Sequence, residues 1–132
     1  MRFVVDASTL IAVVVNEPEK SRLVEITKGV DLLAPASIPW EIGNAFSAML
    51  KRKRIMPEQA VDAVKAYQKI PVRYVEVELD ESLKIAAKHK MYAYDAYLLR
   101  CAKKYKIKLL TLDKRLREIA REMNIEVVEV EA

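Results

Sequence analysis

Apolar residues along the chain fall into short runs that predict buried strands and longer stripes with helical spacing. Strands are predicted at residues 2–5, 31–34, 72–77, 108–112 and 125–130. Helices are predicted between them, at residues 8–16, 18–28, 40–54, 57–70, 80–90, 94–105 and 114–123. Strands that alternate with helices are typical of a parallel sheet covered by helices on both faces. The pattern therefore predicts a three-layer α/β domain with a mostly parallel sheet of four to five short strands.

Two of the predicted helices carry clear signals at their ends. The helix at residues 40–54 has an apolar stripe formed by Ile42, Ala45, Phe46, Met49 and Leu50. Its basic end, residues 51–54, suits a helix C-terminus. The next helix starts at Pro57 and stops before Pro71, which are favoured positions for proline. No linker or repeat interrupts the pattern, so residues 1–132 are expected to form a single domain.

Composition narrows the class of protein without naming a function. A chain that is 52% hydrophobic and 32% charged can bury a core without disulfides, and its one cysteine, Cys101, is expected to be a buried, reduced thiol. The longest uncharged run, residues 7–16, is shorter than the roughly 20 residues of a membrane span. A cytoplasmic location without membrane contact is expected. The net charge of +4 permits a polyanionic partner but does not establish one.

Two acidic residues come directly after predicted strands. Asp6 follows the strand at residues 2–5, and Asp113 follows the strand at residues 108–112. Ligand sites of parallel sheets form beyond the carboxyl ends of the strands. If both strands are central and parallel, the two carboxylates emerge at the same edge of the sheet and can meet.

Two further acids lie at the starts of predicted helices. Asp95 begins a stripe that continues through Leu98, Leu99 and Ala102, so its carboxylate should face the core, where a lone charge is costly. Glu41 opens the helix at residues 40–54 and borders its apolar stripe. Carboxylates that are brought together repel one another unless cations compensate them. Mg²⁺ and Mn²⁺, which prefer oxygen ligands, are the expected cations.

Each acid also has a purely structural interpretation. Asp6, Asp95 and Asp113 each precede or open a helix, where aspartate is a favoured N-cap. Glu41 could be a first-turn acid that interacts with the helix dipole, and Asn44 could be a neutral surface residue. Capping and metal binding do not exclude each other, so both interpretations remain open.

The hydroxyl and basic residues near these acids are equally open. Ser8 and Thr111 could cap a helix or donate a hydrogen bond to a metal ligand. Arg52, within the basic run at residues 51–54, could be solvated or contact RNA. Lys114 and Arg115 follow Asp113 directly and have a better claim to an RNA contact than Arg52 has.

Four segments together resemble the motifs of the PIN-domain family. They are Val-Val-Asp-Ala-Ser at residues 4–8, Pro-Trp-Glu-Ile-Gly-Asn-Ala-Phe at 39–46, Tyr-Asp-Ala-Tyr-Leu-Leu at 94–99 and Leu-Leu-Thr-Leu-Asp-Lys-Arg-Leu at 109–116. Their order and spacing resemble the family as well, across essentially the whole chain. In length and compactness the chain is most similar to the VapC toxins of prokaryotic toxin–antitoxin pairs. Two small departures are Ala7, where a hydroxyl residue is frequent, and the lack of a glycine before Asp95.

The resemblance implies a metal-dependent endoribonuclease that hydrolyses RNA phosphodiester bonds. The acids that match the family's metal site, and that would hold one or two Mg²⁺ or Mn²⁺ ions, are Asp6, Glu41, Asp95 and Asp113. The residues that match the family's polar companions of those acids are Ser8, Asn44 and Thr111. The residues expected to hold the RNA backbone are Lys114, Arg115 and Arg52. Asp113 is expected to bind metal either directly or through water.

The resemblance also implies partners. VapC-like proteins commonly form homodimers and are inhibited by a VapB-type antitoxin, so both are expected here. One alternative is a catalytically weak or inactive PIN domain that binds RNA or acts as a scaffold. A receiver-like signalling module is disfavoured because Asp6 stands alone after the first strand. A haloacid-dehalogenase phosphatase is disfavoured because Ser8 stands where a second acid is needed.

Overall fold

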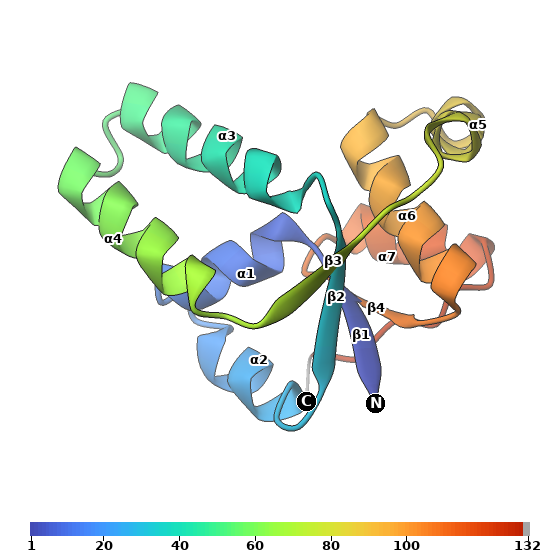
Figure 1. The fold of residues 1–132 in the computed structure, drawn as a ribbon, viewed down its shortest axis with the longest axis horizontal. Coiled ribbons are helices and arrows are strands. Elements are labelled where there is room, and N and C mark those ends of the chain that lie inside the picture. The colour runs from blue at the N-terminus through green and yellow to red at the C-terminus, as the bar shows by residue number, and fades with distance from the viewer. Residues whose placement is uncertain (131–132) are drawn as a thin grey trace.

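Four parallel strands form the centre of the structure, a computed structural model that describes residues 1–130. In sheet order they are β3 (Val72–Val75), β2 (Asp31–Pro35), β1 (Arg2–Val5) and β4 (Lys108–Leu110). Val4 on the central strand β1 pairs with Leu33 on one side and Leu109 on the other. Because all strands run in parallel, their carboxyl ends lie at one edge, which is the upper edge in Figure 1.

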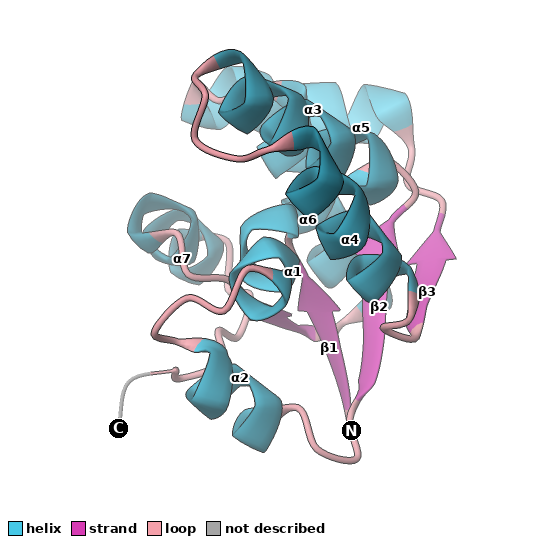
Figure 2. Ribbon diagram, turned by 90° about the vertical axis from the view of Figure 1, so that its left-hand side faces the viewer, coloured by secondary structure: helices cyan, strands magenta, loops and turns pink. Residues whose placement is uncertain are grey.

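Helices cover both faces of this sheet. On one side lie α1 (Ala7–Val14), α2 (Lys20–Ile26), α3 (Ile38–Lys51) and α4 (Pro57–Gln68); Figure 2 is viewed from this side. On the other side, α6 (Ala93–Tyr105) packs on β1, β2 and β4, and α5 (Leu79–His89) packs on α6. The last helix, α7 (Lys114–Glu122), follows β4. The predicted three-layer α/β fold is confirmed.

The expected last strand at residues 125–130 is largely wrong. This segment forms only one bridge, in which Val127 pairs with Leu109 of β4. Strand β4 ends at Leu110 instead of residue 112, and the next residue, Thr111, donates a hydrogen bond to the side chain of Asp6. With so short a neighbour, the final segment has little edge on which to pair.

The core lies on both faces of the central strands. Val4, Val5, Leu109 and Leu110 are almost completely buried, as expected of strands covered on both faces. Cys101 on α6 is also buried, and burial raises its pKa to about 12. Within residues 1–130, no helix combines the length and the apolar character needed to cross a membrane.

Candidate functional site

Asp6 connects the end of β1 to the start of α1. It is the N-cap of α1, and its Oδ1 accepts a hydrogen bond from the Thr9 amide at 3.0 Å. Its Oδ2 accepts bonds from Ser8 Oγ at 3.0 Å and from Thr111 Oγ1 at 2.5 Å. The side chain is only 5% exposed. Asp6 is therefore both a helix cap and a carboxylate held in one orientation at the carboxyl edge of the sheet.

Asp113 makes the same kind of connection between β4 and α7. Its Oδ1 accepts a hydrogen bond from the Leu116 amide at 3.1 Å, and its own amide donates to Thr111 Oγ1 at 3.1 Å. Thr111 is completely buried and thus bridges the backbone of Asp113 to the carboxylate of Asp6. The two acids that follow strands are joined through one hydroxyl.

Glu41 and Asp95 reach the site from the first turns of α3 and α6. Both are half-buried, and Glu41 Oε2 is buried without a hydrogen-bond partner among residues 1–130. Burial, followed by the charges of Asp6 and Asp95, raises the pKa of Glu41 to about 7, while the Ser37 hydroxyl acts in the opposite direction.

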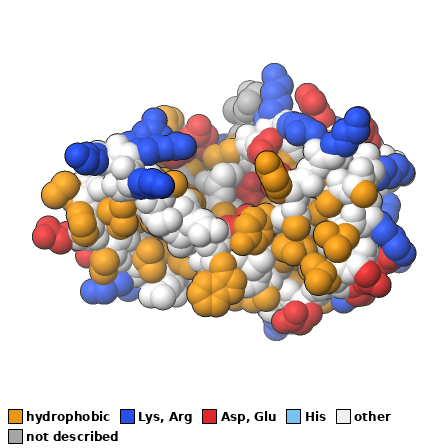
Figure 3. Space-filling model, turned by 90° about the horizontal axis from the view of Figure 1, so that it is seen from above, with side chains coloured by type: hydrophobic (Ala, Val, Ile, Leu, Met, Phe, Trp, Pro, Cys, Tyr) orange, Lys and Arg blue, Asp and Glu red, His pale blue; other side chains and the backbone are white. Residues whose placement is uncertain are grey.

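Asp95 has a raised pKa for similar reasons. Burial is the largest cause, followed by the charges of Asp113 and Asp6, while the guanidinium of Arg115 lowers the pKa. Asp95, Asp113 and Arg115 also line one shallow cavity of about 100 Å³ with residues of α7. Glu41 thus lies within electrostatic range of Asp6 and Asp95, and Asp95 lies within range of Asp6 and Asp113. Figure 3 shows acidic side chains in the hollow of this face, bordered by hydrophobic ones.

The chemistry of this cluster fits a hard divalent cation. All four side chains offer carboxylate oxygens, they repel one another, and one buried oxygen has no partner. Among the described residues, however, no three acidic, histidine or cysteine side chains are arranged as ligands of one ion. The donor set fits a cation, and its side chains would have to turn toward a common point to bind one.

Comparison with known proteins identifies the family. The family model of the PIN domain matches residues 3–122, which include all four acids. The chain belongs to the PIN domain family. The receiver-like and dehalogenase-like alternatives are set aside because the family model matches most of the chain. No curated protein matched the sequence.

Several solved structures share this fold. PAE2754 from Pyrobaculum aerophilum has a TM-score of 0.66 and 24% identity, over 90% of this chain and 87% of that one. VapBC2 from Rickettsia felis, bound to a DNA fragment from its promoter, has a TM-score of 0.69 and 10% identity, over 99% and 100%. FitAcB from Neisseria gonorrhoeae has a TM-score of 0.56 and 15% identity, over 98% and 97%. At these identities, the likeness concerns the fold alone.

The expected polar companions differ in their placement within this PIN domain. Ser8 and Thr111 both donate hydrogen bonds to Asp6. Asn44 is exposed, and in the described part of the chain its side chain makes no hydrogen bond to any of the four acids. Its placement agrees with the interpretation of Asn44 as a helix-surface residue.

The expected basic residues also separate into two groups. Arg115 lies beside Asp95, with its Nη2 donating to the carbonyls of His89 at 3.3 Å and Lys90 at 3.4 Å. Lys114 is exposed at the first position of α7. Arg52 caps the far end of α3, eleven residues from Glu41 and so about 16 Å along the helix axis. Of these three basic residues, Lys114 and Arg115 are therefore the two near the acids.

One residue near the acids was missed by sequence reasoning. Ser37 precedes α3, and its hydroxyl lies close enough to Glu41 to affect the pKa of that carboxyl, although it makes no hydrogen bond of normal geometry. A serine one turn before the acid, at a helix start, was the available signal. The Ser37 hydroxyl thus adds a polar group beside the Glu41 carboxylate.

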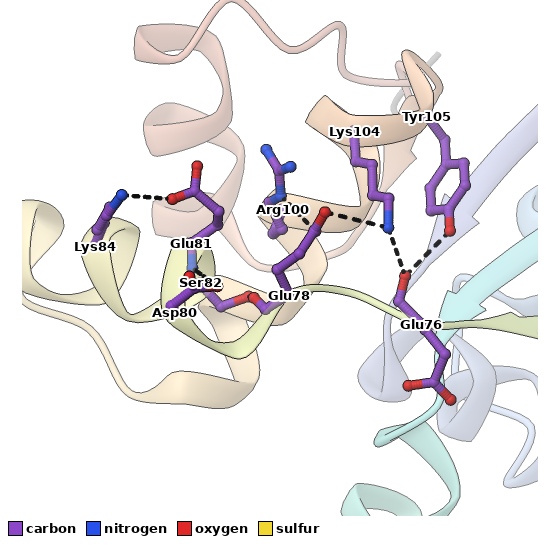
Figure 4. Close-up of polar contacts among 9 residues, drawn as sticks. All are labelled: Glu76, Glu78, Asp80, Glu81, Ser82, Lys84, Arg100, Lys104 and Tyr105. Carbon is purple, nitrogen blue, oxygen red and sulfur yellow. Dashed lines mark hydrogen bonds and ion pairs between the residues drawn. The ribbon is translucent and has the colours of Figure 1, made fainter.

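An ion-pair network ties the segment after β3 to the helix that carries Asp95 (Figure 4). Glu78 accepts a hydrogen bond from Arg100 Nε at 3.1 Å and pairs with Lys104 Nζ at 3.4 Å. Lys104 and Tyr105 also donate to the Glu76 carbonyl. The hydrogen bond from Arg100 is the main cause that lowers the pKa of Glu78 to about 2. The network therefore ties α6 to the segment that connects β3 to α5.

Proposed function

We propose that this PIN domain is a metal-dependent endoribonuclease that hydrolyses RNA phosphodiester bonds with Mg²⁺ or Mn²⁺. The observation that carries the proposal is the state of Glu41, whose buried Oε2 has no partner and whose pKa is raised to about 7 by burial and by two neighbouring carboxylates. A divalent cation among these acids would relieve both the repulsion and the unmet hydrogen-bonding capacity.

The residues proposed to hold the cation are Asp6, Glu41 and Asp95, with Asp113 either a direct ligand or one that acts through water. When bound, a divalent cation supplies activation of water and neutralises charge on phosphate oxygens. Asp6 is kept in a fixed orientation by its three hydrogen bonds, so it can act as the anchor of the set. Arg115, which lines the cavity beside Asp95 and Asp113, and the exposed Lys114 before it are proposed to contact the phosphates of the RNA.

Neutral variants of the acids test the proposed activity. Cleavage of RNA in Mn²⁺ should fall about 100-fold or more in Asp6→Asn and in Asp95→Asn, because each loses a charged ligand. Asp80→Asn is a matched control, since Asp80 is an exposed first-turn acid of α5 outside the cluster. Circular dichroism should show that all variants are folded. Undiminished cleavage by the Asp6→Asn/Asp95→Asn double variant would rule out the assignment and favour an inactive RNA-binding PIN domain.

We further propose that the protein is the toxin of a VapBC-type pair, with a cognate VapB-type antitoxin, a homodimeric state and a cytoplasmic location. The support is the fold shared with the VapBC2 and FitAcB proteins. Expression of the chain should arrest bacterial growth, and co-expression of the product of the adjacent gene should restore it. The Asp95→Asn variant should not arrest growth. Light scattering of the purified chain should give twice the mass of 15.1 kDa.

A further inference from the structure

Exposed aromatic rings border the acidic cluster on two helices. Trp40 lies directly before Glu41 in the first turn of α3 and is 73% exposed. Tyr94 lies directly before Asp95 in the first turn of α6 and is 40% exposed. Exposed apolar side chains that gather beside a polar site are typical of binding surfaces. Each of the two half-buried acids thus has an exposed aromatic residue directly before it in the chain.

A pocket of about 170 Å³ lies at the same edge of the sheet. Its walls come from the turn between β2 and α3, from the segment between β3 and α5, and from α6, and they include Ser37, Leu79 and Tyr97. Tyr97 meets Tyr94 edge-to-face, with 6.0 Å between ring centroids. The Ser37 hydroxyl is buried without a hydrogen-bond partner. Apolar and aromatic walls with a small number of polar groups, here Ser37 and Glu76, are typical of a site for a small ligand or a single base.

We propose that the aromatic rim, defined as Trp40, Tyr94 and the pocket of Ser37, Leu79 and Tyr97, binds unpaired nucleobases of an RNA strand. This proposal rests on the proposed function, because it concerns the RNA strand whose phosphate would lie at the four acidic residues. Four carboxylates repel phosphates, so phosphate contacts alone hold a strand poorly here. Stacking of bases on aromatic rings is independent of charge, and it requires bases that are not stacked in a duplex.

A second copy of this chain is the other occupant to consider for the rim. Docking of an identical apolar surface would remove Glu41 and Asp95 from water without supplying an opposite charge. Burial of unpaired carboxylates is costly, and both of these residues are already half-buried. A nucleobase covers the rings and leaves the acids open to solvent and cations, so the rim fits a base better.

Fluorescence can test the rim directly, because Trp40 is the only tryptophan of the chain. Trp40 emission is followed while the protein is titrated with a single-stranded oligoribonucleotide, with its duplex and with inorganic polyphosphate. The titrations are done in EDTA, which prevents cleavage, and repeated with Mg²⁺. The expected result is saturable quenching by the single strand at concentrations where the duplex and polyphosphate have little effect.

Matched variants locate the bases on the rim. Anisotropy of a labelled single strand should show about 10-fold weaker binding for Trp40→Ala and nearly unchanged binding for Trp40→Phe, since phenylalanine keeps a stacking ring. Leu79→Ala should weaken binding a few-fold. Leu83→Ala is its control, because both leucines are exposed on α5, at 60% and 51%, but only Leu79 lines the pocket.

Several outcomes would overturn the proposal. One is quenching by polyphosphate or duplex that equals quenching by the single strand. Another is equally tight binding of the single strand by Trp40→Ala and by the unmodified chain. A third is Trp40 emission that responds to protein concentration but not to RNA, which indicates a second copy on the rim. If Trp40→Ala binds and cleaves normally, the rim proposal fails while the nuclease proposal stands. If base-dependent quenching occurs but the Asp6→Asn/Asp95→Asn variant cleaves normally, the metal-site assignment fails while the rim stands.

Discussion

The acidic cluster has two halves that carry the same charge in different surroundings. In the strand half, Asp6 and Asp113 each cap a helix, and Thr111 hydrogen-bonds to both residues. In the helix half, Glu41 and Asp95 are half-buried, and Glu41 has a buried oxygen without a partner. The pKa values of both acids of the helix half are raised, and burial is the first cause in each.

This difference separates the contributions of the acids to stability and to function. A carboxylate that accepts several hydrogen bonds is stabilised in its charged form, whereas one that is buried without donors is destabilised. The strand half should therefore stabilise the fold whether or not a cation is present. The helix half should lower stability at neutral pH, which is the usual trade-off at a site selected for activity.

Removal of Asp6 should give the largest loss of stability. Asp6→Ala removes the cap of α1 and the acceptor of the buried Thr111 hydroxyl, so the free energy of unfolding should fall by about 3 kcal/mol. Urea unfolding followed by circular dichroism measures this change. Asp80→Ala is the control, because Asp80 is exposed and accepts only from the neighbouring Glu81 amide. Equal losses in the two variants would contradict the distinction between the halves.

Neutralisation of Glu41 should change the free energy of unfolding in the opposite direction. A rise of the Glu41 pKa from 4.5 to about 7 corresponds to at most ~3 kcal/mol, and solvent screening of a partly exposed group reduces this. Glu41→Gln should therefore raise the free energy of unfolding by about 2 kcal/mol at pH 8.5. The same variant should lose Mn²⁺-dependent cleavage, so that stability and activity change in opposite directions.

The pH dependence of Glu41→Gln checks the cause of this effect. The folded state holds the Glu41 proton more tightly than the unfolded state, so the contribution of Glu41 to stability is full below pH 4.5 and is lost as pH rises to about 7. The increase in the free energy of unfolding of Glu41→Gln over the unmodified chain should therefore be small at pH 4.5 and complete above pH 8. A gain that does not vary with pH would point to packing instead of charge.

The two halves also differ in how far the sequence predicts them. Asp6 and Asp113 could be placed because a residue that follows a central parallel strand lies at the carboxyl edge, whatever the helices do. The apolar stripe that follows Asp95 predicted its inward direction. The unpartnered state of Glu41 could not be predicted, because it depends on distances between helices that are far apart in the sequence. Arg52 shows the same limit, since its helix also carries Glu41 but Arg52 lies at the opposite end of that helix.

Divalent cations should sharpen the contrast between the halves. A cation that binds only the folded state at ten times its dissociation constant stabilises it by about 1.4 kcal/mol. Mg²⁺ or Mn²⁺ should therefore raise the melting temperature of the unmodified chain, and more at pH 8 than at pH 5, where Glu41 is protonated. Differential scanning calorimetry measures the shift. A buffer that contains EDTA and no added divalent cation is the reference. An equal shift of the melting temperature in Glu41→Gln would mean that the cation binds elsewhere.

The smallest effect should come from the hydroxyls that support Asp6. Thr111→Val keeps the shape of a completely buried side chain but removes the donor to Asp6 and the acceptor of the Asp113 amide, so unfolding should become easier by about 1 kcal/mol. Ser8→Ala removes a similar donor from an exposed position, where water replaces it, and should change stability by about 0.3 kcal/mol. Urea unfolding of both variants ranks them. If Ser8→Ala is the more damaging, the strand half is not held together through Thr111, because the buried bridge then contributes less than an exposed hydroxyl.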